Sequence, residues 1–368
     1  KTWMYGASFI QTMPSTVIIS IIHSLSRWIE AASELTDLHR DIFLKICNQI
    51  LELTLENEGP SNDDQPVFSA INHPVGHATY TLINLWFIKK PNDHDLLPAD
   101  IKPFFTKLCD VEKSIYKHGR VLLASRLISL YRVDKKWTET YLLPLFDWQN
   151  HEAKGVWEGF LWSPRLYVPL MVDLKQAFLK TVNHYNQLGE HKQQYARFLT
   201  YAALNNLDGY TSEDFREVFT KLPQEALNEA ARALSDAIKG NAEQSEAYWK
   251  NRIAVFWQKI WPKNISLATV NISESVANII ISSGDEFPIA LESMRGWLKP
   301  IQYPFHLLEE MVENKLCEKF PIESLDLLYL IIKKNDNYSN RLKVCLEEIS
   351  KSNFELKGNY KYLELLNL

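Results

Sequence analysis

Apolar residues recur every three or four positions along most of the chain, which places them on one face of an α-helix. Strand-like alternation is scarce, and the one Asp-Gly dipeptide, Asp208-Gly209, lies between two helical patterns. About fifteen to eighteen segments have the length of an ordinary helix, so the pattern predicts an all-α chain. The clearest stripes lie in residues 17–29, 42–53, 166–178, 225–238, 248–261 and 322–332.

Proline residues mark the starts of several predicted helices, because the first turn of a helix needs no N–H from that position. Two of these starts are alike: "FPIALESM" begins at Phe287 and "FPIESLDL" begins at Phe320, 33 positions later. That spacing is typical of a two-helix repeat unit. The sequence therefore predicts an irregular helical-repeat (HEAT-like) array.

Three polar, proline-containing stretches are candidate breaks in this array, at residues 56–66, 89–98 and 262–271. None is long enough to be a free linker. We expect an N-terminal helical segment over 1–66, a central helical array over 67–262 and C-terminal helical repeats over 263–368, with a bend near Pro262.

Composition and charge narrow the classes of partner. The net charge is −5, from 40 basic and 45 acidic residues, and no basic stripe interrupts this balance. A protein that neutralises phosphates usually shows a basic excess, so we expect no nucleic-acid partner. No apolar run approaches the length of about 18 residues that a membrane span needs, so we expect no membrane partner.

Hydrophobic residues make up 46% of the 368 positions and aromatic residues 12%, enough for a large core. Four cysteines, Cys47, Cys109, Cys317 and Cys345, lie far apart without a CxxC pair. This spacing favours reduced, buried thiols in a cytoplasmic protein over a disulfide framework.

The stretch "FSAINHPVGHATYTLINLWF" holds His73 and His77 four positions apart, which is a metal-ligand spacing when both lie on one helix. Pro74 disfavours helical angles at His73, however, and no third ligand is evident. We interpret the stretch as a joint between two helices, with Asn72 as a cap or turn residue, Pro74 near a helix start and Gly76 at a close contact. We expect Asn72 and His77 to bond to protein groups and to bind no metal.

Signatures of catalysis are largely missing: the chain has no glycine-rich phosphate loop, no GxSxG and no HExxH. His94, Asp95 and Asp100 cluster in a proline-flanked segment, which is typical of a solvated turn. An all-α metal-dependent hydrolase that uses these three residues, or the His73/His77 pair, stays a minor alternative. We expect no catalytic residue and no cofactor.

Tryptophans gather in "FDWQNHEAKGVWEGFLWSP" and in "AYWKNRIAVFWQKIWPKN". In the second stretch, Trp249, Trp257 and Trp261 fall near one helical face, beside Lys250 and Arg252. One interpretation is core between helices. The other is an exposed aromatic surface for a protein partner, because Trp and Arg carry many interface hot spots.

Three stretches resemble a helical region of bacterial anti-phage defence proteins that lies downstream of a sirtuin-like NAD-consuming module. They are "AINHPVGHATYTLINLWF", "AYWKNRIAVFWQKIWPKN" and "ISESVANIIISSGDEFPIALESMRGWL". The resemblance covers Val67 to Leu298 and is clearest after Tyr195. It implies that the upstream module hydrolyses NAD, while the helical region senses infection or controls assembly; no catalytic residue carries over. The chain begins "KTWMYG", without an initiator methionine, and we expect it to be a fragment of such a protein.

The leading hypothesis is a non-catalytic regulatory domain that binds a protein trigger, such as a phage protein, or neighbouring subunits. Binding would restrain or release the upstream effector, and stacked helix pairs offer long surfaces for this purpose. A general interaction scaffold with the same fold is the first alternative, and the metal-dependent hydrolase is the second.

Overall fold

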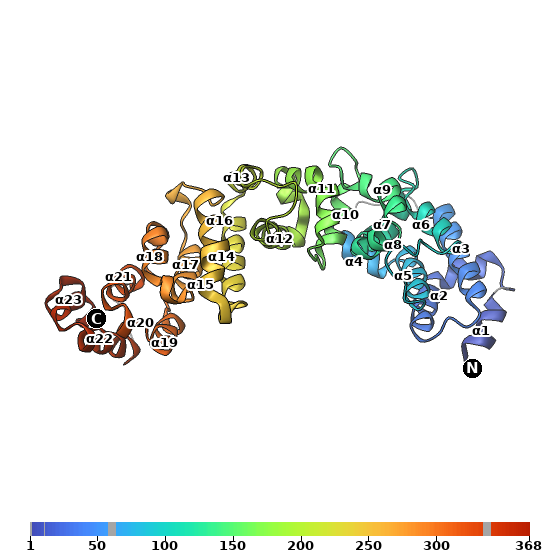
Figure 1. Cartoon of the computed structure of the whole chain (residues 1–368). Coiled ribbons are helices and arrows are strands. Elements are labelled where there is room, and N and C mark those ends of the chain that lie inside the picture. Colours follow the sequence, from blue (N-terminus) through green and yellow to red (C-terminus); the bar gives the residue numbers. More distant parts are fainter. Residues whose placement is uncertain (1, 11, 58–63, 334–339) are drawn as a thin grey trace. The chain divides into compact units, whose positions relative to one another are not determined.

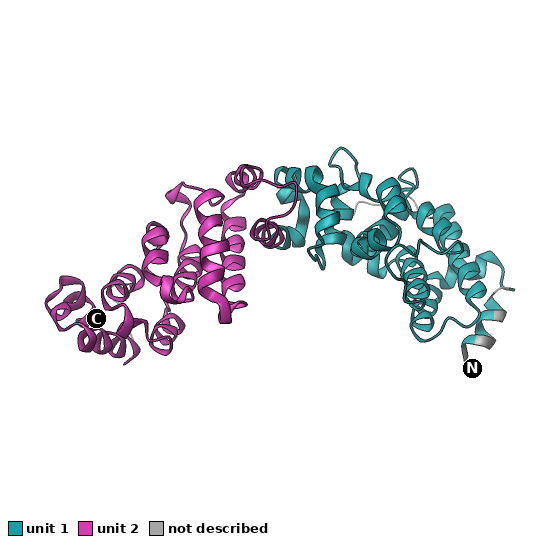
Figure 2. Ribbon diagram, viewed as in Figure 1, with its two compact units in different colours: residues 1–195 teal, residues 196–368 magenta. Residues whose placement is uncertain are grey.

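The computed structural model describes residues 2–10, 12–57, 64–333 and 340–368 (Figure 1). Within these residues the chain is all-α, as predicted: no strand forms, and a single β-bridge joins Ile301 to Ile332. Contacts divide the chain into two compact units, Lys1–Tyr195 and Ala196–Leu368 (Figure 2). This boundary lies inside the segment 67–262, across which the sequence pattern continues without a change in composition.

The first unit contains α1 to α11, and α12 begins in it and ends in the second unit. Their bounds are α1 (Thr2–Ile10), α2 (Ser15–Leu35), α3 (Arg40–Asn57), α4 (Pro66–Asn72), α5 (Pro74–Phe87), α6 (Lys102–Leu108), α7 (Lys117–Ser125), α8 (Leu127–Val133), α9 (Lys135–Tyr141), α10 (Ala153–Leu161), α11 (Val168–Lys180) and α12 (Lys192–Leu204).

The second unit continues with α13 to α23. Their bounds are α13 (Ser212–Lys221), α14 (Gln224–Lys239), α15 (Ser245–Tyr248), α16 (Ala254–Lys259), α17 (Val270–Ile281), α18 (Phe287–Met294), α19 (Phe305–Glu313), α20 (Leu316–Lys319), α21 (Pro321–Ile331), α22 (Asn340–Ser352) and α23 (Tyr360–Leu366).

The labels run to α23, slightly beyond the range of about fifteen to eighteen helices expected from helix length alone. The difference arises because single apolar stripes are broken into shorter pieces. The predicted stripe over 248–261, for example, contains a π-helical turn, Trp249–Ile253, between α15 and α16. Hydrophobic periodicity tolerates such a turn and therefore does not reveal it.

A buried ion pair ties α7 to the segment before α10 in the first unit. Arg120 is 0% exposed, and its Nε and Nη2 donate to the two carboxylate oxygens of Glu152 at 2.9 and 2.8 Å. Its Nη1 donates to the carbonyl oxygens of Leu108 and Asp110 at 3.1 and 2.8 Å. The guanidinium is therefore paired and hydrogen-bonded, as a buried charge must be.

Close helix contacts in this unit require glycine. A Cβ at Gly159 in α10 would overlap the carbonyl oxygen of Val121 in α7, and a Cβ at Gly76 in α5 would overlap that of Ala70 in α4. The structure therefore places Gly76 at a close approach of two backbones, where the sequence analysis expected it. Around these contacts lies a core that includes Trp86 and Trp157.

In the second unit, α14 packs on α17, α17 on α18 and α19, and α19 on α22. The two matched sequence segments begin α18 and α21, and these helices touch. Their first aromatic residues, Phe287 and Phe320, stack on one another with ring centroids 5.8 Å apart. The matched residues thus hold equivalent places in neighbouring helices, while a repeat along the whole chain stays a prediction.

We predict that Gly76→Ala lowers the free energy of unfolding by about 1–3 kcal/mol, because the new methyl group forces α4 and α5 apart. Urea unfolding followed by tryptophan fluorescence measures the change. Gly358→Ala is the matched control, since nothing lies within 4 Å of a Cβ built there. Equal free energies of unfolding for the two variants would contradict the prediction, because they would show that α4 and α5 accommodate the methyl group.

Candidate functional site

The joint between α4 and α5 takes the predicted form with a different capping residue. His73 is the N-cap of α5, and its Nδ1 accepts a hydrogen bond from the Val75 N–H at 3.2 Å. Pro74 is the first residue of α5. Asn72 ends α4 and donates to the carbonyl oxygen of Phe68 at 2.9 Å, so it bonds to backbone without capping α5.

The two histidines of this joint face different partners. His77 is buried and contacts the Glu30 carboxylate through Nδ1, while Arg27 Nε donates to His77 Nε2 at 3.4 Å. Nε2 of His77 is therefore the hydrogen-bond acceptor, and Nδ1 carries the proton and donates a hydrogen bond to the Glu30 carboxylate. The His73 ring stacks instead on His118, with centroids 3.9 Å apart. In the part of the chain that the structure describes, no three His, Cys, Asp or Glu residues gather as metal ligands would.

The His94, Asp95 and Asp100 cluster is also divided among separate partners. Asp95 accepts from the backbone N–H of Asn92 at 2.7 Å, within its own loop. Asp100 pairs with Arg40, and this hydrogen bond lowers the pKa of the Asp100 carboxyl below its usual range. The carboxylates of Asp95 and Asp100 are thus engaged by separate partners.

The prediction of an exposed aromatic surface is wrong, because Trp249, Trp257 and Trp261 are all buried. Trp257 and Trp261 stack with centroids 4.8 Å apart, and Trp297 packs edge-on against both. Residue spacing places side chains on a shared face, but only the neighbouring chain decides whether that face is covered. The core interpretation is the one that the structure shows.

The two basic residues of that prediction are also engaged. Lys250 forms an ion pair with Glu286 at 2.8 Å. Arg252 donates to the carbonyl oxygen of Leu204 at 3.0 Å. Neither side chain therefore belongs to an exposed aromatic patch.

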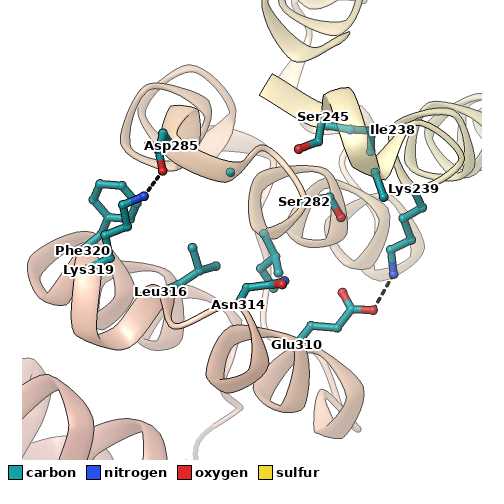
Figure 3. A pocket seen from close by; sticks show the side chains of 13 residues that line it. Ile238, Lys239, Ser245, Ser282, Asp285, Glu310, Asn314, Leu316, Lys319 and Phe320 are labelled. Atoms are coloured by element: carbon teal, nitrogen blue, oxygen red, sulfur yellow. Dashed lines mark hydrogen bonds and ion pairs between the residues drawn. The ribbon is translucent and has the colours of Figure 1, made fainter. Parts of the chain in front are cut away.

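A pocket of about 310 Å³ in the second unit lies among α14, α17, α19 and α20 (Figure 3). Lys239 at one side pairs with Glu310 at 2.8 Å, and also donates to Asn278 at 2.7 Å. At the other side, Lys319 pairs with Asp285. These four charges neutralise one another across the pocket, so it offers little unsatisfied chemistry to a ligand.

A cleft of about 420 Å³ in the first unit has a different character, and we call it the Glu158 cleft. Glu158 lies on α10 and is only 2% exposed. Its Oε1 has no hydrogen-bond partner among the described residues, and its Oε2 lies 3.6 Å from Nδ1 of His191, which also lacks one. A buried carboxylate oxygen without a donor is costly, so it marks a position at which a ligand or water is required.

The backbone opposite Glu158 is shaped to approach the carboxylate. Gly189 has φ +52°, a conformation that side-chain-bearing residues rarely adopt. A Cβ there would stand 3.3 Å from Oε1 of Glu158. Glycine at this position therefore keeps space in front of the carboxylate.

The mouth of the Glu158 cleft is aromatic and its remaining charges are acidic. Phe68 is 63% exposed and Trp162 is 43% exposed, unusual values for side chains of this size. Asp64 and Glu190 also line the cleft, whereas no lysine or arginine among the described residues does. This combination suits a cation on an apolar stem, which pairs with the carboxylates while its stem packs on the rings.

Sequence reasoning missed this cleft although two of its members lie in a tryptophan-rich stretch that it singled out. In "GVWEGFLW", Glu158 is the only charge within an otherwise apolar helical run. A lone carboxylate in such a run is the pattern that points to it. Its approach to Gly189 and His191, some thirty residues later, required the fold.

No protein-family model, curated protein or solved structure matches the chain. The candidate site therefore stands on its geometry.

None of the described helices combines the length and the apolarity that crossing a membrane demands.

His118, the stacking partner of His73, is buried, and burial lowers its pKa to about 3. The folded pKa thus lies below the ordinary value of 6.5. Between these two pH values the unfolded chain binds a proton that the folded chain does not. The contribution of His118 to the free energy of unfolding is therefore fully present above pH 6.5 and is lost as the pH falls toward the folded-state pKa.

We predict that the titration of His118 makes the free energy of unfolding fall by about 1.4 kcal/mol for each pH unit below the ordinary histidine pKa. His118→Phe keeps a ring against His73 but removes the titration, so its unfolding free energy should fall less between pH 7 and pH 5. Urea unfolding at both pH values measures the difference. The exposed His306→Gln is the control, and identical pH dependence of the wild type and His118→Phe would contradict the assignment.

Proposed function

We propose that the chain is a non-catalytic helical domain that binds a protein partner through the Glu158 cleft. The observation that carries the proposal is the buried carboxylate of Glu158, one oxygen of which has no hydrogen-bond donor in the described structure. This carboxylate lies in a cleft that Phe68 and Trp162 also line, and the described lining includes His191 but no lysine or arginine.

The chemistry of the cleft favours a lysine or arginine side chain of another protein. A cation that enters would supply the donor that Glu158 lacks, and charge-assisted hydrogen bonds of this kind are among the stronger ones. Trp162 lines the same cleft and is 43% exposed, so its ring is available to the stem of such a side chain. A central buried anchor with an aromatic rim is typical of the residues that dominate interface energies.

A regulatory role follows from the proposal together with the resemblance to the helical region of sirtuin-linked defence proteins. In this role the bound protein is an infection trigger, such as a phage protein, or a neighbouring subunit, and binding controls an NAD-consuming module upstream. We include a cytoplasmic location in the proposal, and the four buried free cysteines support it.

The full reading frame of the gene separates this role from a general scaffold. An NAD-binding module encoded upstream would support regulation of an effector. A reading frame without such a module would leave the partner-binding domain but remove the effector from the proposal.

We predict that Glu158→Gln weakens partner binding by about tenfold or more, because one charge-assisted hydrogen bond is lost. The probe is a series of short peptides with one central arginine and apolar flanks, measured by fluorescence anisotropy. Affinity capture from infected and uninfected cells, with wild-type and Glu158→Gln chains side by side, extends the test to natural partners. Trp162→Ala should weaken binding as well.

The matched control is Glu213→Gln, an exposed carboxylate on α13 that should leave peptide affinity unchanged. Glu158→Gln should also leave the unfolding free energy unchanged or increase it, because it removes a buried charge without a full set of partners. A less stable Glu158→Gln chain would show that the carboxylate is a structural group and would sink the proposal. Equal peptide affinity of both variants would do the same.

A further inference from the structure

A second cleft of the first unit, of about 380 Å³, has the opposite charge, and we call it the arginine cleft. Arg126, Arg132 and Arg165 line it together with Ser129 and Ser163. No aspartate or glutamate is among its lining residues. Three arginines thus line one cleft in a chain whose net charge is −5.

Arg126 is the central group of this cleft. It lies between α7 and α8 and is partly buried. Its Nε is shielded from solvent and has no hydrogen-bond partner among the described residues, and no carboxylate lies within ion-pair distance of its guanidinium there. A buried donor that stays unpaired costs free energy. An acceptor from a bound ligand would therefore complete the hydrogen bonding of Arg126, which the described residues leave incomplete.

The other two arginines differ in how strongly they are held. Arg165 is exposed in the segment that follows α10, and the described residues place no carboxylate against it. Arg132 is engaged by Asp93, with Nη2–Oδ1 and Nε–Oδ2 distances of 2.8 and 3.1 Å. Asp93 does not line the cleft, and it competes with any anion for Arg132.

The walls of the cleft complete a small-molecule site. Phe160, Leu166 and Tyr167 provide apolar lining, and the Arg132 guanidinium lies over the Tyr167 ring, 5.9 Å from its centroid. The volume falls within the range of about 300–1,000 Å³ that is usual for ligand pockets. The planar donor fork of arginine matches phosphate oxygens in pairs, and serine hydroxyls add further donors.

We propose that the arginine cleft binds the phosphate group of a small molecule whose remaining part packs on Phe160 and Tyr167. The site is separate from the Glu158 cleft, so it is independent of the proposed partner binding. Arg126 and Arg165 supply the donors, and Asp93 weakens the site by holding Arg132.

Isothermal titration of the full chain with phenyl phosphate tests the proposal, because this probe combines one phosphate with one ring. Arg126→Gln and Arg165→Gln should each weaken binding by about tenfold, since each removes a charge-assisted pair of hydrogen bonds. Arg126→Lys should recover only part of the loss, because lysine keeps the charge without the fork. Asp93→Asn should strengthen binding severalfold by releasing Arg132.

Arg216→Gln, in the second unit and paired only with its neighbour Glu213, is the control that should change nothing. Thermal unfolding of every variant separates lost binding from lost folding. The proposal is overturned if phenyl phosphate does not bind, or if Asp93→Asn and Arg126→Gln bind it as the wild type does. Arginine-dependent binding of a single-stranded oligonucleotide without binding of phenyl phosphate would likewise overturn it.

Discussion

The buried pair of Arg120 and Glu152 sets the geometry on which the first unit depends. The guanidinium joins α7 to the segment that precedes α10 and to the carbonyl oxygens of Leu108, which ends α6, and of Asp110 just beyond it. A desolvated charge tolerates little displacement from its partner, because separation leaves both groups buried and unpaired. The pair therefore defines the register of α7 against α10, and Gly159 lets the two helices approach closely.

Both clefts of the first unit depend on that register. Glu158 of α10 and Trp162 at its end line the Glu158 cleft, while Phe160 of the same helix lines the arginine cleft. Arg126 follows the end of α7. The two helices that Arg120 and Glu152 align thus carry the carboxylate of one site and the guanidinium of the other. One structural ion pair thus positions two charged groups, each of which keeps a buried polar atom without a hydrogen bond from the described residues.

Charged residues with a partner and charged residues without one have different roles in this protein. The paired residues hold the fold together, and the candidate sites lie where a buried polar atom has no partner among the described residues. In the second unit, the charged residues around the pocket among α14, α17, α19 and α20 are paired, Lys239 with Glu310 and Lys319 with Asp285. In the first unit, Arg120 is fully satisfied, whereas Glu158 and Arg126 each keep a buried polar atom that no described residue hydrogen-bonds. Local departures from full polar satisfaction are expected where a ligand completes the set.

The sequence by itself determined the all-α class, because a hydrophobic period of 3.6 residues and proline-marked starts are local properties. It also located the α4–α5 joint and the close approach at Gly76, since X-Pro geometry and glycine act within a few residues. The tertiary structure alone decided that Trp249, Trp257 and Trp261 are covered, because burial depends on residues distant in sequence. The two clefts arise in the same way: each gathers charges from several elements, and no spacing along the chain records that meeting.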